Sequence, residues 1–174
     1  MSTVIVLPAL WGRRMAHDPV LHVVLHRPEI PGNAGAIGRT CVAAGAKLWL
    51  VRPLGFRIND RQLRRAGLDY WEDLDWDVVD DWSDLEQRLP NPGRQPWLFS
   101  KSAKRRYTEA TFDVGDVLVF GSETQGLPPP LLASYPGRAL GIPMRPQARS
   151  LNLSVTVGIV VFEALRQWDF RAGD

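Results

Sequence analysis

The sequence predicts an α/β protein in which helices cover both faces of a mostly parallel β-sheet. Apolar runs rich in Val, Leu and Trp alternate along the chain with segments whose apolar residues recur at helical spacing. Glycine, proline and asparagine stand at several of the boundaries between these segments. Alternation of this kind is typical of parallel strands that are joined by crossover helices.

Strands are predicted in five apolar runs, at 21–25, 47–51, 96–99, 116–120 and 139–142. Helices are predicted between and after them, at 33–45, 60–66, 82–89, 128–134 and 151–168. We expect Pro31-Gly32-Asn33 to cap the first helix and Gly45 to end it. Residues 90–93, Pro-Asn-Pro-Gly, break the chain before the next strand.

The chain of 174 residues fits one domain, which we place at 21–170. Residues 1–20 are expected to form a loose N-terminal extension. Their apolar start lacks the basic residues and the cleavage site of a signal peptide. No apolar run reaches the roughly 18 residues of a membrane span, and we expect a cytoplasmic protein. The single cysteine, Cys41, excludes an internal disulfide and is expected to be a buried helix thiol.

The net positive charge of the chain is small, but its basic residues are clustered along the sequence. The net charge is only +2, but Arg outnumbers Lys 18 to 3 and clusters at Arg57–Arg65 and at Lys101–Tyr107. The planar guanidinium matches phosphate oxygens and stacks on bases, so these clusters suit an RNA contact. A solvated face in an arginine-rich chain is the alternative, and composition does not decide between the two.

Several familiar sites are absent from the sequence. The glycines at 32, 35 and 38 lack the Gly-x-Gly turn of a dinucleotide-binding fold, and no glycine-rich phosphate loop with Lys is present. His17, His22 and His26 do not complete a ligand set with nearby carboxylates, so we expect no metal. Ser122 lacks the Gly-x-Ser-x-Gly elbow of a serine hydrolase.

The ligand site is instead expected in the last third of the chain, on three short loops. These are Gly121–Pro128, Ile142-Pro143-Met144 and Ser150–Ser154. Each loop borders an apolar run, and open α/β sheets bind ligands where strands end and helices begin.

Five segments in order resemble the SPOUT superfamily of RNA methyltransferases. They are Pro28–Thr40, Arg64–Tyr70, Phe120–Pro128, Ile142–Met144 and Ser150–Ser154. The Arg-Arg-Ala-Gly-Leu-Asp-Tyr segment and the short chain are most similar to the TrmL (YibK-like) tRNA (cytidine/uridine-2′-O)-methyltransferases. The resemblance covers roughly residues 21 to 168. Phe162 stands where relatives often carry Tyr, and Ser122 replaces a common Pro.

The resemblance implies that the C-terminal segment is threaded into a trefoil knot, which pattern alone would not suggest because knots are rare. It also implies S-adenosylmethionine as the cofactor. Carried over residue by residue, it places the cofactor contacts at Leu98, Gly121, Gly126, Ile142, Ser150 and Leu151. Glycines at 121 and 126 allow a close approach of backbone to ligand, and Leu98, Ile142 and Leu151 offer apolar walls.

The catalytic residues that the resemblance implies are Arg39, Asn33, Glu123 and Asn152. A guanidinium is almost always protonated, so we expect Arg39 to clamp the target phosphate and stabilise the developing alkoxide. Glu123 is expected to orient Arg39 through a bidentate pair. Taken singly, Asn33 and Asn152 are as readily helix caps.

The predicted activity is methylation of the ribose 2′-hydroxyl of the wobble cytidine or uridine in tRNA. A homodimer is implied, and the apolar helix at 151–168 is either buried or shared with a partner. Two alternatives stay open: an enzyme of the superfamily acting on ribosomal RNA or on another tRNA position, and an RNA-binding relative without activity.

Overall fold

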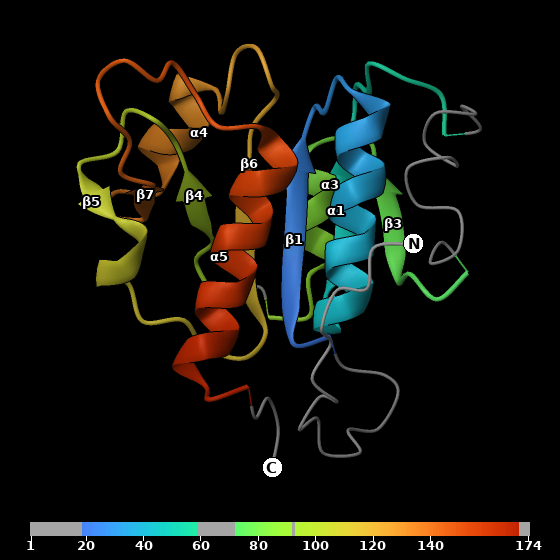
Figure 1. The fold of residues 1–174 in the computed structure, drawn as a ribbon. Helices are drawn as coiled ribbons and strands as arrows, with labels where there is room; N and C mark the ends of the chain where they lie inside the picture. The colour runs from blue at the N-terminus through green and yellow to red at the C-terminus, as the bar shows by residue number, and fades with distance from the viewer. Residues whose placement is uncertain (1–18, 59–71, 92, 171–174) are drawn as a thin grey trace, which may run out of the picture.

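The computed structural model describes residues 19–58, 72–91 and 93–170, which form a seven-stranded sheet in the order β3-β2-β1-β6-β4-β7-β5 (Figure 1). Every pair of neighbouring strands is parallel. The strands are β1 Leu21–His26, β2 Lys47–Val51, β3 Trp76–Val79, β4 Trp97–Phe99, β5 Arg105–Arg106, β6 Asp116–Phe120 and β7 Ala139–Gly141.

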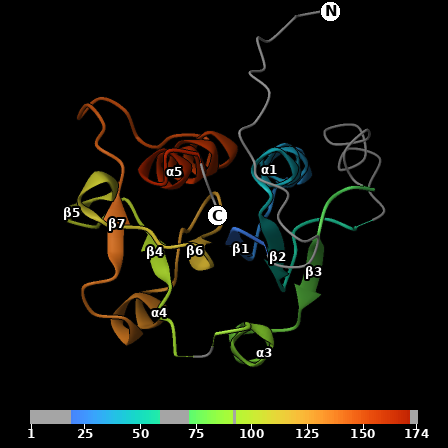
Figure 2. The same ribbon diagram turned by 90° about the horizontal axis from the view of Figure 1, so that it is seen from below.

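Helices cover both faces of this sheet, as the sequence predicted. In the described ranges they are α1 Pro31–Ala44, α3 Trp82–Arg88, α4 Pro129–Ser134 and α5 Leu153–Gln167, with a short 3-10 helix at Tyr107–Glu109. Helices α1 and α5 lie side by side on one face, and α3 and α4 lie on the other (Figure 2).

The five predicted strands are confirmed with ends that differ by no more than one residue, and four predicted helices with ends that differ by no more than two. The helix predicted at 60–66 lies outside the described residues, as do the Arg64–Tyr70 motif, most of the Arg57–Arg65 cluster and residues 1–18. Strands β3 and β5 were not predicted. An aspartate interrupts the apolar run of β3, and β5 is two exposed arginines long.

Two hydrophobic clusters fill the spaces between the sheet and its helices. Leu21, Val23 and Leu25 of β1 pack toward α1 and α5, whereas Val24 packs with Trp49 and Leu85 on the opposite face. The central strands are therefore buried on both sides, which explains why they are near-continuous apolar runs. The trefoil knot implied by the resemblance stays a prediction, because strand order does not define how the chain is threaded.

Helix α1 begins and ends much as its sequence indicated. Pro31 occupies the first turn, and Gly45 ends the helix in the left-handed conformation with φ of 68°. Asn33, however, lies inside the helix and is not its N-cap; that position belongs to Ile30, whose side chain makes no capping hydrogen bond. Cys41 is fully buried, as predicted, and burial raises the pKa of its thiol.

His22 is a buried group whose protonation opposes folding. It is 3% exposed, and its Nδ1 accepts a hydrogen bond of 3.1 Å from the indole nitrogen of Trp49. Burial, with a smaller contribution from Lys47, lowers the pKa of His22 to about 4. Burial also lowers the pKa of His26.

We expect acidification to destabilise the protein through His22. As the pH falls below 6.5, His22 is protonated in the unfolded chain, whereas in the folded chain it stays neutral until about pH 4. The free energy of unfolding therefore decreases as the pH falls through that window. The loss should reach about 2 kcal/mol at pH 5 relative to pH 7.5. Urea unfolding at both pH values should show this excess loss in the wild type and not in His22→Gln; equal losses in the two proteins would refute it.

No helix in the described part of the chain is long and apolar enough to cross a membrane.

Candidate active site

A cavity of about 620 Å³ lies at the carboxyl ends of β4, β6 and β7. The loops that follow these strands supply its walls, together with the start of α1 and the residues before α5. Phe99 and Phe120 line it with their rings stacked 4.6 Å apart between centroids, and Leu140 and Ile142 extend this apolar lining. The position at the ends of parallel strands is the one predicted for the ligand site.

The loop after β6 is closed on itself. The backbone nitrogen of Gly126 donates to the carbonyl of Ser122 at 2.9 Å, and Gly126 has φ of 70°. A Cβ at Gly121 would overlap the backbone of Gly126 and Leu127. Gly121 is therefore required by the closure of its own loop, a stronger constraint than the approach to a ligand from which it was predicted.

Glu123 fixes this loop to the start of α1. Its Oε2 accepts a hydrogen bond from the backbone nitrogen of Glu29 at 2.8 Å, and its Oε1 accepts one from the nitrogen of Ile30 at 3.2 Å. The same Oε1 accepts from Nδ2 of Asn33 at 2.9 Å. A carboxylate at the positive end of a helix dipole is stabilising, so Glu123 performs the capping that Ile30 does not.

The orientation of Arg39 by Glu123 through a bidentate pair stays a prediction. Both oxygens of Glu123 accept hydrogen bonds from the start of α1. Arg39 lies six residues beyond Asn33, which is about 9 Å along the helix. Its exposed side chain does not line the cavity.

Asn33 continues the connection from Glu123 to the last helix. Its Oδ1 accepts a hydrogen bond of 3.0 Å from Nδ2 of Asn152. Asn152 is the N-cap of α5, where its own Oδ1 accepts from the nitrogens of Ser154 and Val155 at 2.8 and 3.4 Å. The capping interpretation of Asn152 is thus confirmed, and the cap is also one end of a polar chain between two helix starts.

The structure gathers eight of the ten predicted site residues around the cavity. They are Asn33, Gly121, Glu123, Gly126, Ile142, Ser150, Leu151 and Asn152. The exceptions are Arg39 and Leu98. Leu98 is fully buried in the cluster with Val24 and Trp49, so it does not form the predicted apolar wall; Phe99, its neighbour on β4, does.

Other lining residues were not among the ten predicted site residues, although Met144 lies on one of the three predicted loops. Ser100, Lys101 and Ser102 follow β4, and Ile30, Met144 and Arg149 lie on the remaining loops. The parallel strand pattern placed the end of β4 beside the site, which is the signal that would have found Ser100–Ser102. The cavity combines apolar walls, loop backbone and two cations, Lys101 and Arg149. This suits a ligand with a planar apolar ring and an anionic end.

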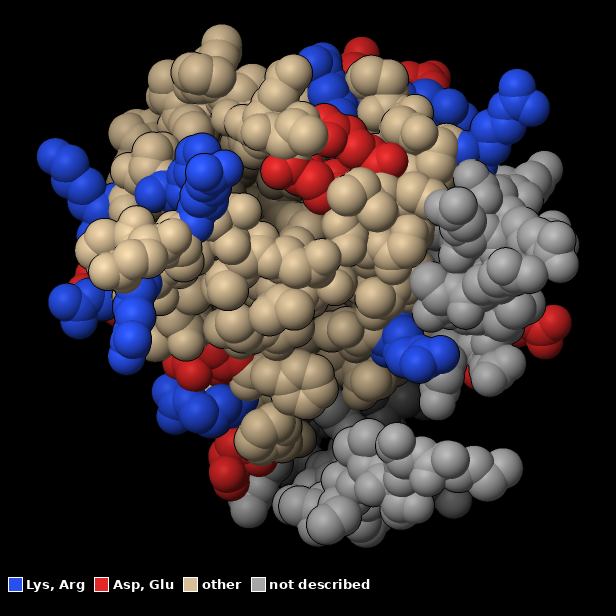
Figure 3. Space-filling view, turned by 45° about the horizontal axis from the view of Figure 1, so that its top comes forward, with Lys and Arg blue, Asp and Glu red and all other residues tan. Residues whose placement is uncertain are grey.

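No group of three or more His, Cys, Asp or Glu residues suited to holding a metal ion occurs within residues 19–58, 72–91 and 93–170. Figure 3 shows the cavity end of the molecule, where the surface is hollowed between acidic and basic side chains.

Comparison with known proteins gives consistent matches. A tRNA (cytidine(34)-2′-O)-methyltransferase from Burkholderia cenocepacia is 46% identical over 88% of this chain and 99% of its own length. A structure from a study of the 2-OH methylation of C/U34 on tRNA has a TM-score of 0.82 at 46% identity and covers 87% of this chain and 97% of that chain.

A third match carries a ligand. An AdoMet-bound rRNA methyltransferase from Sinorhizobium meliloti has a TM-score of 0.75 at 29% identity and covers 87% of this chain and 57% of that one. The model of the SpoU rRNA Methylase family matches residues 20–162, which include the three loops of the cavity and the start of α1. The chain belongs to this family.

Proposed function

We propose that this protein is an S-adenosylmethionine-dependent 2′-O-methyltransferase that modifies the wobble cytidine or uridine of tRNA. One observation carries the proposal: near-complete alignment at 46% identity with a tRNA (cytidine(34)-2′-O)-methyltransferase. The family model carries the name of ribosomal RNA methylases, which keeps a ribosomal RNA substrate as the second candidate.

The cavity fits the proposed cofactor. Its volume of about 620 Å³ lies within the range of small-molecule sites. Phe99, Phe120 and Ile142 provide apolar surface for the adenine, while the 121–126 loop offers backbone groups to its edge and to the ribose. We assign Lys101 and Arg149 to pairing with the carboxylate of the cofactor. When bound, the cofactor supplies the methyl group from its sulfonium.

The residues of this chain then have distinct tasks. Glu123, Asn33 and Asn152 hold the loop after β6, the start of α1 and the start of α5 in one arrangement, so we assign them to positioning. Arg39 stands on α1 outside the cavity, where it clamps a phosphate of the bound RNA and stabilises negative charge on the ribose oxygen. The ribose proton passes to phosphate or water.

Mapping the product tests the proposal. Unmodified tRNA and ribosomal RNA are each incubated with the protein and methyl-labelled cofactor, digested, and analysed by mass spectrometry. The proposal expects one added methyl on the ribose of nucleotide 34 of tRNA. Label on ribosomal RNA alone would establish the second candidate, and label on neither would leave an RNA-binding protein without activity.

We further propose that the protein is a homodimer in the cytoplasm, with residues 21–170 as its single domain and 1–20 as an extension. Helices α1 and α5 share one face, and apolar residues are exposed along α5 and beside the cavity: Val155 is 50% exposed, Phe162 47% and Ile30 48%. An exposed apolar patch of this kind suits contact with a second copy.

Disrupting that patch should give a monomer. Phe162→Glu places a charge within the proposed interface, and light scattering coupled to gel filtration should then report the 19.5 kDa chain mass in place of twice that mass. Gln87→Glu, an exposed change on α3, should leave the dimer intact. The interface is wrong if Phe162→Glu elutes and scatters as the wild type does.

A further inference from the structure

Six cations lie together at one edge of the molecule, next to the cavity. They are Lys101, Lys104, Arg105, Arg106, Arg145 and Arg149, all exposed, and we call them the basic edge. The first four form one segment between β4 and the 3-10 helix, and the other two lie on the loop between β7 and α5. Strand β5 is the last strand of the sheet, so no other strand of the described ranges covers this edge.

Strand pairing brings the two parts of the basic edge together. Arg105 and Arg106 are in register with Leu140 and Gly141 of β7, directly before the loop that carries Arg145 and Arg149. The edge is continuous with the cavity, because Lys101 and Arg149 line it. Figure 3 shows basic side chains gathered on this side of the hollow.

Little negative charge neutralises the basic edge. No Asp or Glu occurs between Glu123 and Glu163, nor between residues 94 and 106. Within the described ranges, the ion pair of Arg106 with Glu109 is the one that involves this edge, at 3.9 Å between exposed groups. Pairs of this kind contribute little, so the cations remain available to an anion.

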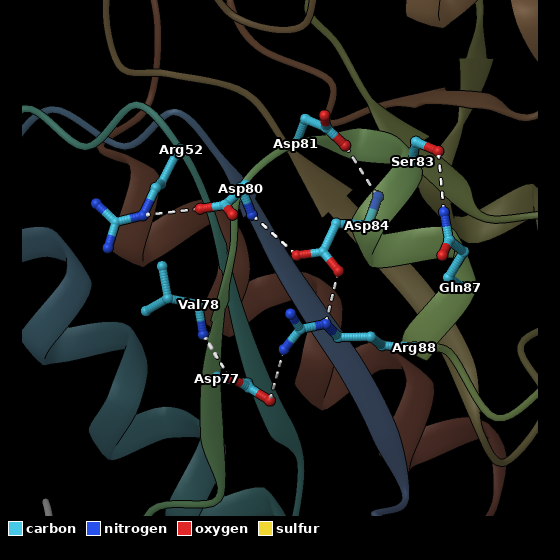
Figure 4. A network of polar contacts seen from close by, with 9 residues as sticks. All are labelled: Arg52, Asp77, Val78, Asp80, Asp81, Ser83, Asp84, Gln87 and Arg88. Carbon is cyan, nitrogen blue, oxygen red and sulfur yellow. Dashed lines mark hydrogen bonds and ion pairs between the residues drawn. The ribbon is translucent and has the colours of Figure 1, made fainter.

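The opposite edge of the sheet carries the reverse charge. Four aspartates lie around β3 and the start of α3 (Figure 4): Asp77, Asp80 and Asp84 pair with the two nearby arginines, and Asp81 caps α3. Arg52 lies 3.5 Å from Asp80, and Arg88 lies 2.7 Å from Asp84. Among the described residues, aspartates therefore gather at one edge of the sheet and basic side chains at the other, which a net charge of only +2 does not reveal.

We propose that the basic edge binds the phosphate backbone of the RNA substrate and leads it past the mouth of the cavity, while the acidic edge repels the RNA. The inference rests on the proposed function and specifies the surface that serves it. A polyanion is the occupant whose charge complements a continuous row of cations beside a cavity for the methyl donor. Phosphate contacts position the RNA, whereas recognition of the target base depends on residues at the mouth of the cavity.

Salt-dependent binding of tRNA tests the proposal without the cofactor. The variant Lys104→Gln/Arg145→Gln removes two exposed cations that do not line the cavity. Fluorescence anisotropy at 50–200 mM KCl should show tRNA affinity roughly 10- to 30-fold weaker at 100 mM, and a slope of log affinity against log salt that is shallower by about 1.5. Affinity for S-adenosylmethionine should not change.

The control removes the same amount of charge from the acidic edge. Arg52→Gln/Arg88→Gln also lowers the formal net charge by two, and it should bind tRNA no more than about twofold more weakly than the wild type, because these arginines already face carboxylates. The proposal is overturned if the basic-edge variant keeps wild-type affinity and slope, or if the control loses as much affinity. Charge reversal in Lys104→Glu/Arg145→Glu should weaken binding further, with melting temperatures confirming that each variant folds.

The two proposals fail separately. Should the wild type methylate tRNA while the basic-edge variant binds it normally, the surface is wrong and the activity stands. Should the wild type bind tRNA through these cations and transfer no methyl group to any RNA, the activity is wrong and the surface stands.

Discussion

Arg39→Ala should lower kcat/KM for methylation of unmodified tRNA by about 10²- to 10³-fold while leaving the affinity for S-adenosylmethionine nearly unchanged. The cavity that would hold the cofactor is lined without Arg39, so its geometry does not depend on that side chain. The reaction should depend on it, because the ribose oxygen gains negative charge beside a phosphate and the guanidinium is the group assigned to stabilise both. Methyl transfer assays and calorimetric titration of the cofactor separate the two effects.

Arg39→Lys is the informative partner of this variant. It keeps the positive charge and loses the planar fork, so an intermediate loss of about tenfold identifies bidentate phosphate binding as the role of the side chain. Arg88→Ala removes an exposed guanidinium from α3 on the other face of the sheet and should retain full activity. Full activity in Arg39→Ala would refute the mechanism, and so would a loss that is matched by lost cofactor binding.

Gly121→Ala should abolish cofactor binding and destabilise the protein by about 3 kcal/mol or more. The added Cβ would overlap backbone atoms of Gly126 and Leu127. Backbone atoms cannot move aside by a change of rotamer, as a flexible side chain could. Relief requires the loop to open, and an open loop draws Glu123 away from the start of α1. Thermal unfolding should show a fall in melting temperature of roughly 10 °C.

Gly126→Ala is a matched control in the same loop. A Cβ there meets no atom within 4 Å, but the φ of 70° strains any side chain, so the cost should be about 1 kcal/mol and a few degrees. Gly121→Ala must therefore be the more damaging of the two. Equal melting temperatures for the two variants, or wild-type cofactor affinity in Gly121→Ala, would show that loop closure does not determine the shape of the site.

Among the strands, the sequence revealed the more deeply buried ones and missed β3 and β5, whose residues are mostly half-buried or exposed. Strand β1 is buried throughout because both of its faces are covered, and its four apolar residues between and beside His22 and His26 are enough for a simple pattern rule to find it. Strand β5 consists of Arg105 and Arg106, and only its pairing with β7 makes it a strand. Leu98 was assigned to the cavity because an apolar residue there fits the family pattern, but neighbouring strand residues face opposite sides and sequence does not say which side holds the ligand.

The site residues were found more readily than their partners. The resemblance identified Glu123, Asn33 and Asn152 as a group, but it did not predict the hydrogen bonds that they form. Asn152 was considered as a cap because asparagine is a preferred N-cap residue and it stands near the predicted start of the last helix. The capping of α1 by Glu123 joins residues more than 90 positions apart, and no local pattern encodes such a contact.

That same connection sets when the site can exist during synthesis. The bonds that complete it join residues 29–33 to Glu123 and then to Asn152, so α1 leaves the ribosome long before the groups that cap and order its first turn. Contacts between such distant parts of a chain form late, after local helices and the first strand pairs. A nascent chain that ends before residue 152 contains all seven strands of the described sheet and lacks the residue that completes the pocket. The methyl donor site is thus a property of the completed chain, and neither half of the protein supplies it alone.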